Sequence, residues 1–195
     1  MNCRPHHTLS NQEQQLKTHI LAALLAVALP ALPALAQTAN KDILAKHWKT
    51  SGEFTAAVAA AMPADGYSFR PVPEEMSFGE VMAHIATADR GACAVASGLT
   101  APAIPAKLST WLKDPGKVDV DKDTAIQFIN DTFAFCSKAI AEMPASRADT
   151  VVGTPSRNLT GSEYLWAYFT HTAHHRGQAE VYLRLKGIKP PEYEF

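Results

Sequence analysis

Apolar residues recur at steps of three and four through most of this 195-residue chain, and no stretch alternates apolar and polar residues as a half-buried strand would. The pattern predicts four amphipathic helices, at about Lys41–Ala61, Ser77–Gly98, Asp121–Met143 and from Thr160 or Ser162 to Lys186. Four such helices in one domain predict an all-α fold, a four-helix bundle.

The ends of these helices carry local signals. Ser77 followed by Glu80 is the pattern of a capping box, in which each side chain bonds the other residue's backbone N–H. Gly187, with two prolines soon after it, stops the last helix. Two connections, Leu99–Val120 and Pro144–Leu159, are longer than a simple bundle requires, and such loops tend to be lids, binding elements or crossovers.

Two of the helices indicate which face they bury. The third has a continuous apolar seam, made of Ile126, Ile129, Phe133, Cys136, Ile140 and Met143. The fourth has an apolar stripe that we expect to pack on the core, with its glycine allowing close helix approach, made of Trp166, Phe169, Ala173, Gly177 and Val181. The fourth helix also carries a second, mostly polar stripe, made of Tyr164, Tyr168, His171, His175, Gln178, Tyr182 and Leu185. If this stripe is buried, its polar side chains need hydrogen-bond or metal partners.

The N-terminal segment has the features of an export signal. Lys17 precedes the apolar run Ile20–Ala36, which ends in Ala-Leu-Ala. We therefore expect a signal peptide over residues 1–36, cleavage after Ala36, a mature domain over residues 37–195 and a periplasmic or secreted protein without stable membrane insertion. The other interpretation is an uncleaved anchor, and the run of 17 residues is at the short limit for a membrane span.

Charge and cysteine content narrow the function classes. With 18 basic and 19 acidic side chains the net charge is −1, so no basic surface for nucleic acid is expected. Cys93 and Cys136 remain after the leader. They would pair as a disulfide in an oxidising compartment or pack as two small buried hydrophobes, and the sequence leaves both open.

Four histidines are the candidates for chemistry. His171 and His175 lie one turn apart on the fourth helix, and His84 falls on the inner side of the second. Bundles build metal sites from facing helices, so these three predict a divalent metal site with open coordination positions. His174 is rotated about 60° from His171 and is expected to support the site or pack in the bundle. The alternative is a structural bundle whose histidines only form hydrogen bonds.

Three segments together resemble the DinB-like superfamily of four-helix metalloproteins, over essentially the whole mature chain. They are Ser77-Phe78-Gly79-Glu80-Val81-Met82-Ala83-His84-Ile85-Ala86, His171-Thr172-Ala173-His174-His175-Arg176-Gly177-Gln178 and Gly187-Ile188-Lys189-Pro190-Pro191. The resemblance implies an up-down-down-up bundle with a long crossover between helices two and three. It also implies a divalent ion, zinc or nickel in many members, at His84, His171 and His175, and a possible homodimer.

The resemblance extends to function. Related branches include transferases and isomerases that use low-molecular-weight thiols, which implies a metal-dependent enzyme of the thiol-dependent transferase or hydrolase type, acting on a small-molecule substrate or thiol. Glu80 or a tyrosine of the second stripe would then assist proton transfer. The alternative is a non-catalytic module that binds a metal or a small ligand.

Overall fold

The computed structural model describes residues 15, 19, 31–116, 119–153 and 156–193. Contacts divide the chain into residues 1–40 and a compact unit of residues 41–195. Most of the expected signal peptide lies outside the described residues, so its cleavage after Ala36 stays a prediction. Within the described part of the chain, no helix is both long and apolar enough to cross a membrane.

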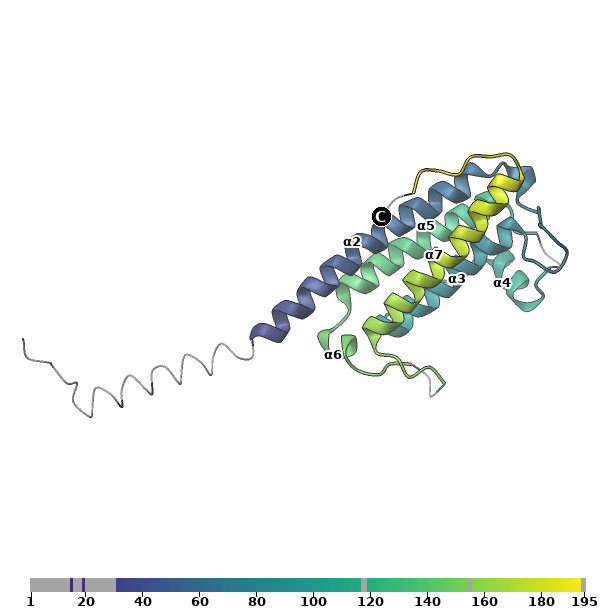
Figure 1. Ribbon diagram of the computed structural model, residues 1–195. Helices are drawn as coiled ribbons and strands as arrows, with labels where there is room; N and C mark the ends of the chain where they lie inside the picture. The colour runs from purple at the N-terminus through teal and green to yellow at the C-terminus, as the bar shows by residue number, and fades with distance from the viewer. Residues whose placement is uncertain (1–14, 16–18, 20–30, 117–118, 154–155, 194–195) are drawn as a thin grey trace, which may run out of the picture. The chain divides into compact units, whose positions relative to one another are not determined.

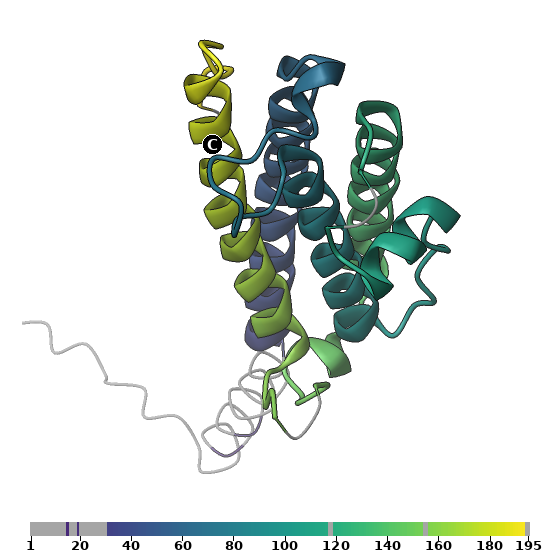
Figure 2. The ribbon, with the colours of Figure 1, turned by 90° about the vertical axis from the view of Figure 1, so that its right-hand side faces the viewer.

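The described part of the chain is helical. Its elements are α2 (Ala31–Ala61), the 3-10 turn η1 (Ala64–Gly66), α3 (Phe78–Ser97), α4 (Ala106–Lys113), α5 (Lys122–Glu142), α6 (Ala145–Ala148) and α7 (Gly161–Leu185). In residues 41–195 the long helices α2, α3, α5 and α7 run alongside one another (Figures 1 and 2). The predicted all-α bundle is confirmed, and the predicted ends agree closely, except that α2 begins at Ala31 rather than Lys41.

Contacts between helix ends give the direction of each helix. Lys122 Nζ, at the start of α5, donates to Ala60 O at the end of α2 over 2.8 Å, so these two helices are antiparallel. Tyr182, near the end of α7, donates to Met76 O just before α3 over 3.0 Å, so α7 is antiparallel to α3. Near the starts of α3 and α5, a Cβ on Gly79 would reach Val120 O. Far from both starts, the disulfide between Cys93 and Cys136 joins the same two helices. Since the two helices meet at corresponding positions along their length, α3 and α5 are parallel.

The order is therefore up-down-down-up, as expected, and the chain between α3 and α5 is the crossover. It carries α4, which lies beside α3 (Figure 2) and buries Leu108 and Trp111. Trp111 Nε1 donates to Glu80 Oε1 over 3.1 Å, and the backbone N–H of Gly116 donates to the same oxygen over 3.0 Å. One buried carboxylate thus fastens the crossover to the first turn of α3.

Local caps explain where the long helices begin. Ser77 and Glu80 form the predicted capping box on α3. Thr160 and Glu163 form a second one on α7, which settles the start of that helix at Thr160 rather than Ser162. Gly98 ends α3 with φ 79°, a conformation that costs other residues far more than glycine.

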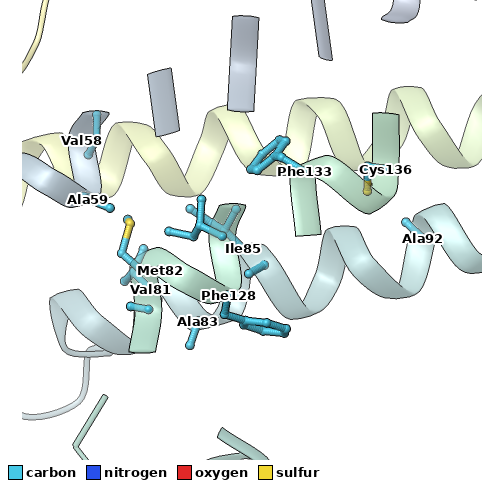
Figure 3. Close-up of a cluster of buried hydrophobic side chains, with 14 of the residues drawn as sticks. Val58, Ala59, Val81, Met82, Ala83, Ile85, Ala92, Phe128, Phe133 and Cys136 are labelled. Atoms are coloured by element: carbon cyan, nitrogen blue, oxygen red, sulfur yellow. The ribbon is translucent and has the colours of Figure 1, made fainter. Parts of the chain in front are cut away.

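The core lies between α2, α3, α5 and the buried face of α7. Figure 3 shows side chains from the first three of these helices converging, among them Val58 of α2, Ile85 of α3 and Phe133 of α5. The disulfide between Cys93 and Cys136 lies in this core with a Cα–Cα distance of 5.3 Å, which resolves the alternative left open by the sequence.

The predicted apolar face of α7 was right for Phe169, whose ring centroid lies 6.1 Å from that of the buried Trp48, and wrong for the other members of the stripe. Trp166 and Val181 are 41% and 51% exposed, and a Cβ added to Gly177 would meet nothing within 4 Å. The stripe that packs on the bundle is instead made of Leu165, Thr172, Arg176, Ala179 and Leu183. It was missed because a threonine and an arginine interrupt its apolar pattern, and both are buried with partners on other helices.

Candidate metal centre

The structure brings together the three predicted histidines. His84 comes from α3, and His171 and His175 come from successive turns of α7. One ring nitrogen of each lies within 4.8 Å of the others, and all three side chains are half-buried. His84 Nε2 and His171 Nε2 are 3.2 Å apart.

This spacing fits a metal ion. In a tetrahedral site with metal–nitrogen bonds of about 2.0–2.1 Å, two nitrogens are separated by roughly 3.3–3.4 Å. The 3.2 Å between the two Nε2 atoms is close to that edge, although it also suits a hydrogen bond between neutral imidazoles. Three nitrogen donors occupy three positions of such a site and leave the remaining ones open.

The local environment keeps the three rings neutral, which is the form that binds metal. Burial lowers the pKa of His171 to about 4, with a further contribution from the neighbouring imidazoles. Burial also lowers the pKa of His84 and of His175, and in His175 the bond to Gln178 partly opposes this. At neutral pH the site therefore presents lone pairs rather than charged rings.

A side-chain amide orients one of these rings. His175 Nδ1 donates to Gln178 Oε1 over 2.7 Å, which leaves Nε2 of the neutral ring unprotonated and able to bind an ion. Gln178 Nε2 in turn lies 3.4 Å from His174 Nε2. His174 is exposed, so it does not pack in the bundle; it contacts Gln178 and the edge of the His175 ring, with the two ring centroids 4.8 Å apart.

Buried polar groups fix the rotation of α7, and the sequence did not reveal them. Thr172 donates to the carboxylate of Asp89 on α3, with distances of 2.9 and 2.8 Å to its two oxygens. Arg176 Nη1 donates to Ser51 Oγ over 2.9 Å and to Thr55 Oγ1 over 3.3 Å, both on α2.

These anchors alternate with the histidines along the helix. Thr172 follows His171 and Arg176 follows His175, so each anchor is rotated about 100° from the ring before it. When the anchors reach Asp89 and Ser51, the two rings are turned toward His84. The buried network therefore presents the histidine pair to α3.

Glu80 has a structural role. Burial raises its pKa, but bonds from the Ser77 backbone, Arg70 and Trp111 outweigh this and lower the pKa below its usual value. Arg70 Nη2 lies 2.7 Å from its second oxygen. Glu80 is thus occupied as a cap and an anchor of the crossover, and the expected proton-transfer role gains no geometric support.

The tyrosines of the second stripe differ in their surroundings. Tyr182 is bonded to the backbone of Met76. Tyr168 lies beside the site, with its ring centroid 5.5 Å from that of His171, and its hydroxyl accepts a hydrogen bond from Arg157. Arg157 was not singled out from the sequence because it lies in an irregular connection without periodicity.

The fold and the cluster define a helical-bundle protein with a candidate centre for a divalent metal. The sequence model of the DinB superfamily matches residues 47–179, and the chain belongs to that superfamily. No protein of curated function matches it by sequence.

Solved structures share the fold. A DinB-like protein from Bacillus cereus is similar at 20% identity and a TM-score of 0.63, over 77% of this chain and 95% of its own. A DinB-like protein from Bacillus subtilis has 21% identity and a TM-score of 0.57, over 77% of this chain and 95% of its own. A conserved protein from Enterococcus faecalis has 16% identity and a TM-score of 0.58, over 74% of this chain and 95% of its own.

Proposed function

We propose that this protein holds one divalent metal ion, zinc or nickel, on His84, His171 and His175. The observation that carries the proposal is the convergence of three neutral imidazoles from two helices, with ligand atoms within 4.8 Å of one another. Imidazole suits both metals, and the donor set alone does not select between them. Membership of the DinB superfamily and the orienting bond from Gln178 support the same assignment.

The site is of the open type, and we infer a metal-dependent enzyme, either a thiol-dependent transferase or a hydrolase. An ion held by three histidines lowers the pKa of a thiol or water molecule that reaches it. The second candidate is a non-catalytic module that captures a small ligand. The environment of Glu80 favours the non-catalytic module. Its carboxylate is held by Arg70, Trp111 and the backbone, so it is not free to transfer a proton to or from a substrate.

Metal analysis of the purified protein tests the site. We expect close to one zinc or nickel ion per chain, a higher melting temperature with metal than with chelator, and loss of both effects in His171→Ala. His174→Ala is the matched control, because this exposed neighbour should leave the stoichiometry unchanged. Absence of a bound ion, together with unchanged melting of His171→Ala, would sink the metal site.

Incubation of the metal-loaded protein with small thiols and electrophilic substrates separates the enzyme from the module. Turnover that His84→Ala abolishes supports the enzyme. Tight binding of small molecules without turnover supports the module. Hydrolysis of ester or amide substrates without added thiol would identify the hydrolase form.

We also propose that the protein is exported and cleaved after Ala36. The apolar run Ile20–Ala36 supports this, and so does the disulfide between Cys93 and Cys136, because such bonds persist in oxidising compartments. N-terminal sequencing of the protein from the culture medium or periplasm tests the proposal. A mature chain should begin at Gln37, and a full-length chain retained in the cytoplasm would contradict it.

A further inference from the structure

The charges around the three histidines are one-sided. After burial and the neighbouring rings, Arg157 also helps to lower the pKa of His171, which shows that its positive charge is close to the cluster. No described carboxylate contributes to the pKa shifts of the three rings. Because neutral imidazoles do not compensate a divalent ion, the site with its ion would be strongly cationic.

The nearest carboxylates on α3 do not offset this charge. Glu80 is paired with Arg70 at 2.7 Å and is buried. Asp89 is fully buried on the core side of α7, where its carboxyl group is hydrogen-bonded to the Thr172 hydroxyl. An anionic ligand would therefore meet cationic groups without a competing carboxylate from these positions.

Arg157 lies close to the cluster and is connected to it through Tyr168. It is exposed, it donates to the Tyr168 hydroxyl, and its guanidinium carbon lies 5.8 Å from the Tyr168 ring centroid. That ring lies 5.5 Å from the ring of His171. No ion pair among the described residues includes Arg157, so the rest of its guanidinium is available for a ligand.

Backbone hydrogen bonds link Arg157 and Leu159 to each other and to Val152. Val152 N donates to Leu159 O over 3.0 Å, and Leu159 N donates to Arg157 O over 2.9 Å. A Cβ on Gly153 would lie 2.1 Å from Arg157 O and 2.7 Å from the ring of Tyr164. Only glycine permits this close approach, which packs the backbone of Gly153 and Arg157 next to Tyr164 of α7.

We propose that the substrate or ligand of the metal centre is a small molecule that carries a carboxylate, which Arg157 binds while a second donor group of the molecule faces the three histidines. The proposal rests on the metal site proposed above and adds the class of molecule that the site takes. A guanidinium presents a fork of N–H donors that matches a carboxylate. The two short steps from Arg157 through Tyr168 to His171 restrict the ligand to a compact molecule.

Cobalt-loaded protein and two hydroxamates test this proposal. Succinic acid monohydroxamate and butyrohydroxamate share the metal-binding group and a short chain, and only the first carries a carboxylate. Affinity is read from the visible absorption of cobalt. We expect the wild type to prefer the carboxylated probe about tenfold, as one charged hydrogen-bonded contact would give. In Arg157→Gln the two probes should bind within about twofold of each other.

Arg184→Gln is the control, because it removes an exposed arginine charge from α7 about 24 Å along the helix from Tyr168, the residue that Arg157 contacts. It should keep the tenfold preference. Equal binding of both probes by the wild type, or a preference that survives in Arg157→Gln, overturns the proposal while cobalt remains bound at one ion per chain. Failure to bind cobalt at all instead refutes the metal site, and this proposal with it.

Discussion

The buried carboxyl group of Asp89 predicts an unusual dependence of stability on pH. Burial raises the pKa of Asp89 to about 8, although the Thr172 hydroxyl and the charge of Arg176 partly oppose the shift. In the unfolded chain the value is about 3.9. Below pH 4 the group is protonated in both states. As the pH rises, the unfolded chain loses this proton first, so the stability that the raised pKa provides is lost progressively up to about pH 8.

The substitution Asp89→Asn isolates this effect, because the amide has nearly the same shape, still accepts from Thr172 and does not ionise. One proton corresponds to about 1.4 kcal/mol per pH unit, or roughly 3 kcal/mol between pH 5 and pH 7. The free energy of unfolding of the wild type minus that of the variant should fall by about this amount over the interval. We compare the wild type with the variant because the three histidines also change the stability with pH. Their pKa values are lowered in the folded protein, so they add stability as the pH rises to about 6.5 in both proteins, and this contribution cancels in the difference.

Urea unfolding of metal-free protein at pH 5, 6, 7 and 7.5, with the disulfide intact, measures the difference. Asp42→Asn is the control, because it makes the same substitution at an exposed carboxyl on α2. A constant difference for Asp89→Asn would show that the carboxyl ionises normally in the folded protein. A difference that grows with pH would show that Arg176 stabilises the ionised form.

Three further predictions concern the bonds and the site. The double substitution Cys93→Ala/Cys136→Ala should lower the free energy of unfolding by about 4 kcal/mol, because the bridge spans a sequence separation of 43 residues; urea curves that coincide with those of the wild type would refute this. Gln178→Leu should weaken metal binding by about 10- to 100-fold, as measured by competition with a chromophoric chelator. His174→Ala should leave the affinity for the metal unchanged. If both variants weaken metal binding equally, Gln178 does not orient His175. Because the pKa values of the three histidines are lowered, metal affinity in the same assay should stay nearly constant from pH 7.5 to 6.5 and fall at lower pH, and a decline that begins above pH 7 would contradict it.

Local signals predicted much of this fold. The capping box at Ser77 and the seam of the third helix are encoded within a few residues, and both are confirmed. The pairing of His171 with His175 is equally local, since it depends only on helical spacing. His84 was found because it lies on the inner side of an amphipathic helix, and the structure brings it to the pair.

Long-range partners explain what the sequence did not reveal. Thr172 and Arg176 lie in the buried stripe of α7, and their partners are 83 and 125 residues away. No local pattern marks a polar residue whose partner is that distant, so the exposed stripe of Trp166 and Val181 was taken for the buried one. The pairing of Cys93 with Cys136 likewise depends on a Cα separation that only the three-dimensional structure provides.

The disulfide also constrains the order in which the molecule is assembled. It closes a covalent ring that contains the end of α3, the whole crossover and most of α5. His84 precedes that ring by nine residues, while His171 and His175 follow it on the last helix. The ring can close before the last helix docks, but three histidine ligands exist together only afterwards. An ion that requires all three therefore binds only the finished bundle, and its retention reports that the final helix is in place.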